Sequence, residues 1–126
     1  MEGEAILSIV ERIQTGKWQL VNSEAIAVEL EKLQNFRKKR QIHNVLKLAD
    51  FIQRIDTDVD FRTKELERFG FGLFDAFHIA CAEAAQADAF LTTDDRLLKA
   101  AQRNAGSIKV SIENPVIWLM HFLQSE

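Results

Sequence analysis

Three acidic residues in the second half of the chain have the types and spacing that could hold a metal ion. Asp75 stands at the start of an alanine-rich segment, and Asp94 and Asp95 follow the short apolar segment 88–92, which is predicted to be a buried strand. In an open α/β sheet, ligands collect just past the carboxyl ends of the strands. Two carboxylates brought together there would be oxygen ligands for a hard divalent cation such as Mg²⁺ or Mn²⁺.

The same aspartates also have a simpler interpretation. Asp is a preferred helix N-cap and is favoured at the positive end of the helix dipole, so Asp75 and Asp94 could each do no more than begin a helix. The two acids share one strand–helix frame with Thr92 and Thr93 beside it, and this combination favours a site.

Three short pieces of sequence follow one another in this region. They are Asp75-Ala-Phe-His-Ile-Ala, then Ala-Asp88, then Leu-Thr-Thr-Asp94-Asp-Arg-Leu. Together they resemble the C-terminal half of PIN domains, which are metal-dependent ribonucleases that include the VapC-type toxins of bacterial toxin–antitoxin pairs. The resemblance implies catalytic acids at Asp75 and Asp94. It also gives Asp95 a role in assisting Asp94, and Thr92 or Thr93 a role in orienting a water or a carboxylate.

A third acid comes from the first half of the chain. Glu29 lies on the helix predicted for 24–33, and on residue chemistry alone it would be a surface glutamate that pairs with Lys32. PIN domains, however, carry an acid on the helix after their second strand, and the spacing from Ser23 to Glu29-Leu matches that pattern. The resemblance therefore implies that Glu29, Asp75 and Asp94 together hold the metal.

Basic residues are concentrated in one run. It consists of Arg37, Lys38, Lys39 and Arg40. Most such runs are solvated helix faces or connectors. In a nuclease these four residues, and Arg96 beside the presumed site, could instead contact RNA phosphates.

Composition limits the class of protein. The 126 residues fit one domain, spanning 1–126, with 47% apolar and 28% charged residues. A net charge of −3 argues against a broad basic surface for nucleic acid. The single cysteine, Cys81, cannot form an internal disulfide and is expected to be buried, and no apolar run reaches transmembrane length. We therefore expect a cytoplasmic protein without a membrane partner.

The hydrophobic pattern predicts alternating helices and strands. Helices are expected over 4–15, 24–33, 42–55, 62–68, 74–86, 94–104 and from Pro115 onward, and strands over 18–22, 88–92 and 108–112, with 55–61 as a polar edge segment. This order predicts a three-layer α/β/α domain of the PIN type with a short parallel sheet. His78 is expected to pack in the core or behind the metal ligands.

The chain departs from the PIN pattern at its start. PIN domains begin with a short apolar strand that ends in an aspartate and lies at the centre of the sheet, whereas this sequence starts at the helix that follows it. We expect an N-terminally truncated domain, with a late start site, a true truncation and a repaired fold all left open. An unpaired strand edge would favour a homodimer or a partner that supplies a strand.

These observations give two functional hypotheses. The first is an Mg²⁺- or Mn²⁺-dependent endoribonuclease that cuts single-stranded or structured RNA, a toxin–antitoxin component whose activity is impaired by the missing acid. The second is a catalytically inactive PIN-like protein that dimerises or pairs with an antitoxin.

Overall fold

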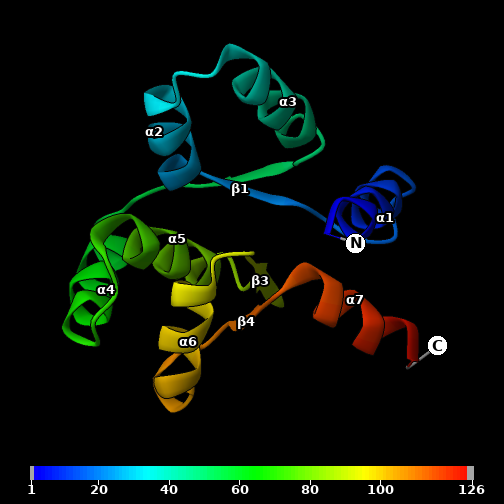
Figure 1. Cartoon of the computed structure of the whole chain (residues 1–126). Coiled ribbons are helices and arrows are strands. Elements are labelled where there is room, and N and C mark those ends of the chain that lie inside the picture. The colour runs from blue at the N-terminus through cyan, green and yellow to red at the C-terminus, as the bar shows by residue number, and fades with distance from the viewer. Residues whose placement is uncertain (1, 125–126) are drawn as a thin grey trace.

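The computed structural model describes residues 2–124, which contain seven α-helices, one 3-10 turn and four short strands (Figure 1). The helices are α1 (Glu2–Gln14), α2 (Glu24–Lys32), α3 (Phe36–Leu46), α4 (Thr57–Arg68), α5 (Leu73–Ala84), α6 (Asp95–Arg103) and α7 (Pro115–Gln124), and the 3-10 turn is Ala105–Ser107. The strands are β1 (Val21–Ser23), β2 (Phe51–Gln53), β3 (Ala89–Leu91) and β4 (Ser111–Glu113).

The strands form two separate parallel pairs. β1 pairs with β2, with Val21 opposite Phe51, and β3 pairs with β4, with Ala89 opposite Ser111. Parallel neighbours need a crossover connection. Helices α2 and α3 make the crossover from β1 to β2, and α6 makes the one from β3 to β4. The predicted α/β class with parallel strand pairing is confirmed, although within residues 2–124 the strands form two small sheets.

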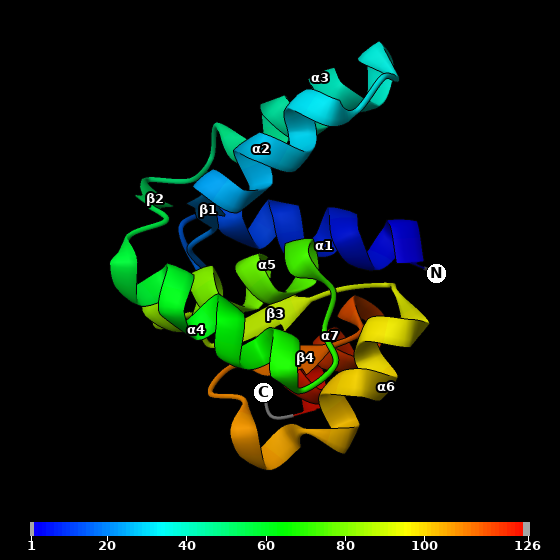
Figure 2. The same ribbon diagram turned by 90° about the vertical axis from the view of Figure 1, so that its left-hand side faces the viewer.

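Helices cover the strands from both sides. In Figure 1 the strands lie between α4 and α5 on the left and α1 and α7 on the right, with α2 and α3 above them. The view of Figure 2, turned by 90°, places α4 and α5 in front of the β3–β4 pair and α7 behind it. The two views agree on three layers, which is the α/β/α order expected from the sequence.

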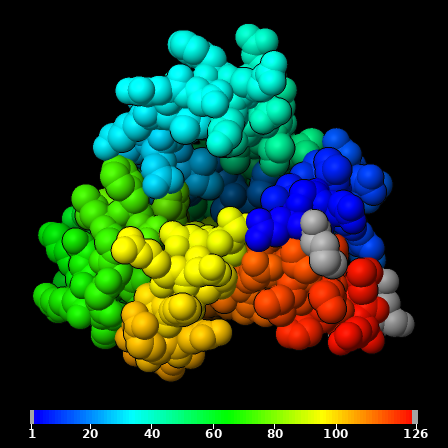
Figure 3. All heavy atoms as spheres, in the orientation of Figure 1, coloured from blue at the N-terminus to red at the C-terminus, as the bar shows by residue number. Residues whose placement is uncertain are grey.

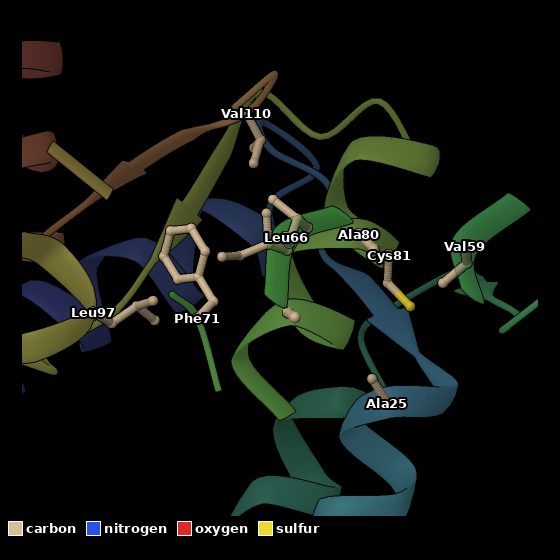
Figure 4. Packing of buried hydrophobic residues seen from close by; sticks show 10 residues of the cluster. Ala25, Val59, Leu66, Phe71, Ala80, Cys81, Leu97 and Val110 are labelled. Atoms are coloured by element: carbon tan, nitrogen blue, oxygen red, sulfur yellow. The ribbon is translucent and has the colours of Figure 1, made fainter. Parts of the chain in front are cut away.

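The core is centred on the contact between α4 and α5 (Figure 4). Leu66 of α4 and Ala76 and Ile79 of α5 are completely buried. Small alanine side chains let α5 lie close to its neighbours, and α5 contacts α2, β1, β2 and β3 as well as α4. Cys81 is buried in this cluster, as predicted, and burial raises the pKa of its thiol. Helix α5 is therefore the element on which the two strand pairs converge.

Helix α7 packs against α1 through aromatic side chains. The ring of Trp18, just after α1, lies 4.8 Å from that of Trp118 and 4.9 Å from that of Phe122, measured between centroids. These contacts give Trp118 a packing role, while Phe122 keeps part of its side chain exposed. None of the helices within residues 2–124, the apolar α7 included, has the length and apolar character needed to cross a membrane.

The regions with strong local signals form the predicted elements. Helices α1, α2, α5, α6 and α7 and strand β3 lie within one or two residues of the ranges expected from the sequence. Of the strands expected at 18–22 and 108–112, only the last two residues of each range are in a strand. Each strand, β1 and β4, continues one residue beyond the expected range. Gly16, two residues after the end of α1, has a φ of +81°, a left-handed conformation that glycine adopts easily.

The middle of the chain was predicted wrongly. The expected helix 42–55 is divided into the end of α3 and strand β2, because Phe51 and Ile52 pair with β1 instead of continuing the helical repeat. The segment 55–61, expected at a sheet edge, begins α4. Asp56 caps that helix by accepting a hydrogen bond from the Val59 N–H at 2.9 Å. The aspartates of the segment 55–61 therefore mark the start of a helix.

Candidate metal-binding site

Asp75 lies in the first turn of α5 and is not the residue that caps it. The N-cap is Gly72, which offers no side-chain hydrogen bond. The carboxylate of Asp75 is partly buried and makes no side-chain hydrogen bond that the structure of residues 2–124 records. Asp75 therefore does not cap α5, although it lies in the first turn, where the helix dipole favours an acid. Its carboxylate is available for another role.

Asp94 does cap its helix, and it does so with one oxygen. Its Oδ1 accepts hydrogen bonds from the N–H groups of Arg96 at 3.0 Å and Leu97 at 3.3 Å, at the start of α6. The hydroxyl of Thr92 accepts a hydrogen bond from the Asp94 N–H at 3.1 Å, which fixes the turn after β3. Since both capping bonds end on Oδ1, the cap leaves Oδ2 of Asp94 for a second role.

Glu29 is held by a partner that its sequence pattern does not predict. Its Oε2 lies 2.9 Å from Nε2 of His78, which is on α5 one turn beyond Asp75. Lys32, the expected partner of Glu29, lies instead over the ring of Phe74 at 4.4 Å from its centroid. The spacing of Asp75 and His78, three residues apart, indicates only that both lie on one helix face, and it does not reveal the contact with Glu29.

The three acids line one cavity of about 990 Å³, together with His78 and Thr92. Burial raises the pKa of the Asp75 carboxyl, and the negative charge of Asp94 raises it further. His78 lowers that pKa and Glu29 raises it. Asp94 and Glu29 are therefore each close enough to Asp75 to repel its negative charge. Within residues 2–124, however, no three Asp, Glu, His or Cys side chains form a group that could hold a metal ion as they stand.

The cavity lies between the two strand pairs. Its walls include Val21 and Ser23 of β1 and Ala89, Phe90 and Leu91 of β3, and it extends past Ile9 and Ile13 of α1 to the rings of Trp18, Trp118 and Phe122. Figure 3 shows this face hollowed where α2, α1 and the segment before α6 meet. A largely apolar interior thus opens beside a cluster of acids.

The remaining site candidates lie outside this cavity. Thr93, Asp95 and Arg96 are exposed at the start of α6 and do not line it. The four basic residues 37–40 form the first turns of α3, which buries no residue, and none of them lines the cavity. The structure thus brings Glu29, Asp75, Asp94 and Thr92 together, and it leaves the basic candidates on neighbouring surfaces.

The raised pKa of Asp75 predicts how the stability of the metal-free protein depends on pH. The folded state holds the Asp75 proton more tightly than the unfolded chain does, so stability falls as the pH rises from the usual Asp pKa through the raised one. Asp75→Asn should therefore increase the free energy of unfolding at neutral pH. That gain should shrink as the pH falls through about 4, the usual pKa of Asp, and disappear in stronger acid, where the carboxyl is protonated in both states. Urea unfolding in EDTA across this range measures the difference, and a gain that persists in acid would contradict the assignment.

Comparison with known proteins gives one match. The model of the PIN domain family matches residues 2–103. Searches of curated proteins and of solved structures each gave no significant match. The matched range runs from α1 to the end of α6 and includes all three acids that line the cavity. The chain therefore belongs to the PIN domain family.

Proposed function

We propose that this chain is a metal-dependent endoribonuclease in which Glu29, Asp75 and Asp94 hold Mg²⁺ or Mn²⁺. PIN domains are in general metal-dependent nucleases, and membership of the family supports the reaction class. One observation carries the assignment to residues. Three carboxylates from α2, α5 and the start of α6 line the same cavity, where repulsion by Asp94 and Glu29 contributes to the raised pKa of Asp75.

The chemistry of this donor set fits a hard divalent cation. Carboxylate oxygens are the ligands such cations prefer, and clustered negative charges are costly without a positive charge between them. When bound, the cation activates a water and stabilises the charge that develops on the phosphate. As the side chains of residues 2–124 stand, they form no group that could hold a metal ion, so we keep the expectation of weakened activity.

Other side chains have supporting roles in this proposal. Thr92 fixes the backbone at Asp94 through its hydroxyl, and Asp95 and Thr93 stand beside it at the start of α6. RNA phosphates would be contacted by Arg96 and by the exposed basic turns of α3, where Lys and Arg supply affinity independent of sequence.

The cavity between β1 and β3 is where we propose that the first strand of other PIN domains lies. We place that strand and its aspartate there in proteins that carry it, since each of β1 and β3 pairs on only one side within residues 2–124. A fourth carboxylate would then join the three acids. The exposed Phe51 and Ile52 of β2 offer an apolar edge for a second copy or for an antitoxin, in keeping with a VapC-type toxin role.

A second function is a PIN-like binding protein that cleaves nothing. One specific observation favours it: no group of side chains within residues 2–124 could hold a metal ion as placed, Glu29, Asp75 and Asp94 included. Such a protein would dimerise or pair with an antitoxin while its acids remain as features of the fold.

Cleavage of a mixed-sequence, fluorescent single-stranded RNA distinguishes the two functions. The ribonuclease should cut this RNA in Mn²⁺ and not in EDTA, and Asp75→Asn should remove the cleavage. Because Asp75 makes no capping bond, this variant should stay folded, which circular dichroism checks. No cleavage by the unaltered chain, or equal cleavage by both proteins, would leave the binding function as the better account.

A further inference from the structure

We infer that His78 is a positioning residue that holds Glu29 in place as a metal ligand. This inference deepens the proposed function and rests on it. The two side chains come from α5 and α2, and Nε2 of His78 lies 2.9 Å from Oε2 of Glu29. An ionised carboxylate can only accept a hydrogen bond, so the Nε2–H of His78 is the donor in this contact and Glu29 is the acceptor.

The imidazole is held more firmly than the carboxylate it contacts. The side chain of His78 is 12% exposed, and its ring lies edge-on to that of Phe90 on β3, with 6.4 Å between the centroids. The side chain of Glu29 is 51% exposed and extends from the surface of α2. A glutamate in that setting has several rotamers of similar energy, and ordering it costs conformational entropy. The hydrogen bond from His78 reduces the number of those rotamers before a cation arrives.

The contact also leaves Glu29 able to act as a ligand. It occupies Oε2, so the hydrogen bond to His78 leaves Oε1 for a cation. His78 follows Asp75 by one turn on the same helix face, and both line the cavity that contains Glu29. Helix α5 thus supplies one acid directly and fixes a second acid, from another helix, through His78.

Binding of Mn²⁺ to the metal-free protein, followed by electron paramagnetic resonance, tests this role without relying on activity. His78→Phe keeps an aromatic ring against Phe90 but removes the donor. It should weaken Mn²⁺ binding by about tenfold, at the low end of the effect of removing an outer partner of a ligand. His78→Gln restores an N–H donor and should recover most of the lost affinity.

Two comparisons separate positioning from a general loosening of the fold. In a Glu29→Gln background, His78→Phe should have little further effect, since His78 acts through Glu29. Lys32→Met removes the contact of Lys32 with Phe74, which also joins α2 to α5, and it should leave Mn²⁺ affinity undiminished. An equal loss in Lys32→Met, or an undiminished effect of His78→Phe in the Glu29→Gln background, would overturn the inference.

The outcomes also separate this inference from the proposed function. If the unaltered chain binds Mn²⁺ and Asp94→Asn weakens that binding, while His78→Phe binds as tightly as the unaltered chain, only the positioning role is wrong. If the unaltered chain binds no Mn²⁺, the proposed function fails for this chain, and the positioning role fails with it.

Discussion

Arg62→Ala should lower the free energy of unfolding by about 3–5 kcal/mol, because it leaves a buried carboxylate without its charged partner. The guanidinium of Arg62 on α4 donates to both oxygens of Glu83 on α5, at 2.7 and 3.1 Å. The side chain of Glu83 is only 6% exposed, and it also accepts a hydrogen bond from the Lys109 N–H at 2.8 Å. Hydrogen bonding to Glu83 raises the pKa of Arg62, so the guanidinium stays charged.

This loss should be a large part of the total free energy of unfolding, which is about 5–15 kcal/mol for small domains. Urea or thermal unfolding measures it. Lys64→Ala on the same helix is the matched control, because Lys64 pairs with Asp60 at 3.7 Å on an exposed surface. Exposed pairs contribute about 0–1 kcal/mol. Similar effects of the two substitutions would show that Glu83 is not buried in the way described.

Asp94→Asn should separate the two roles that the sequence analysis left open for this aspartate. Asn is as good an N-cap as Asp, so the hydrogen bonds to Arg96 and Leu97 should persist and stability should change little. The substitution removes the negative charge that a divalent cation needs. We therefore expect Mn²⁺-dependent RNA cleavage to fall by about 100-fold or more, in line with the loss of a group that stabilises charge in the transition state.

The control for this prediction is Asp94→Ala, which removes both the charge and the cap. It should lose activity to the same extent and, in addition, about 1 kcal/mol of stability. Unfolding curves and cleavage rates on the three proteins give both quantities. Full activity in Asp94→Asn would mean that Asp94 is a cap alone, and the metal site would have to be assigned without it.

The sequence predicted best where several local signals agree. Around α5, β3 and α6, the alanine-rich helix, the short apolar strand and the capping aspartate coincide within one stretch, and each element formed as expected. The acids of this stretch could be named for the same reason. Glu29 could be proposed as a ligand only through the family pattern, because nothing in its own surroundings distinguishes it from a surface glutamate.

The features that the sequence did not predict depend on contacts between segments far apart in the chain. Phe51 and Ile52 fit a helical repeat, and only their pairing with β1 makes them a strand. The contact between Glu29 and His78 joins residues 49 positions apart, and the one between Arg62 and Glu83 joins two helices. No periodicity within one element encodes such pairs, so the sequence could suggest which acids form a site but could not show which side chains hold them.

The packing of α1 against α7 has a consequence for how the protein is made. Both tryptophans of the chain meet in this contact, one following the first helix and the other within the last. A chain synthesised from its N-terminus completes α1 long before the partner of that helix exists. The side of α1 that contacts α7 therefore stays uncovered until α7 has been synthesised, and tryptophan fluorescence would report when α1 and α7 come together.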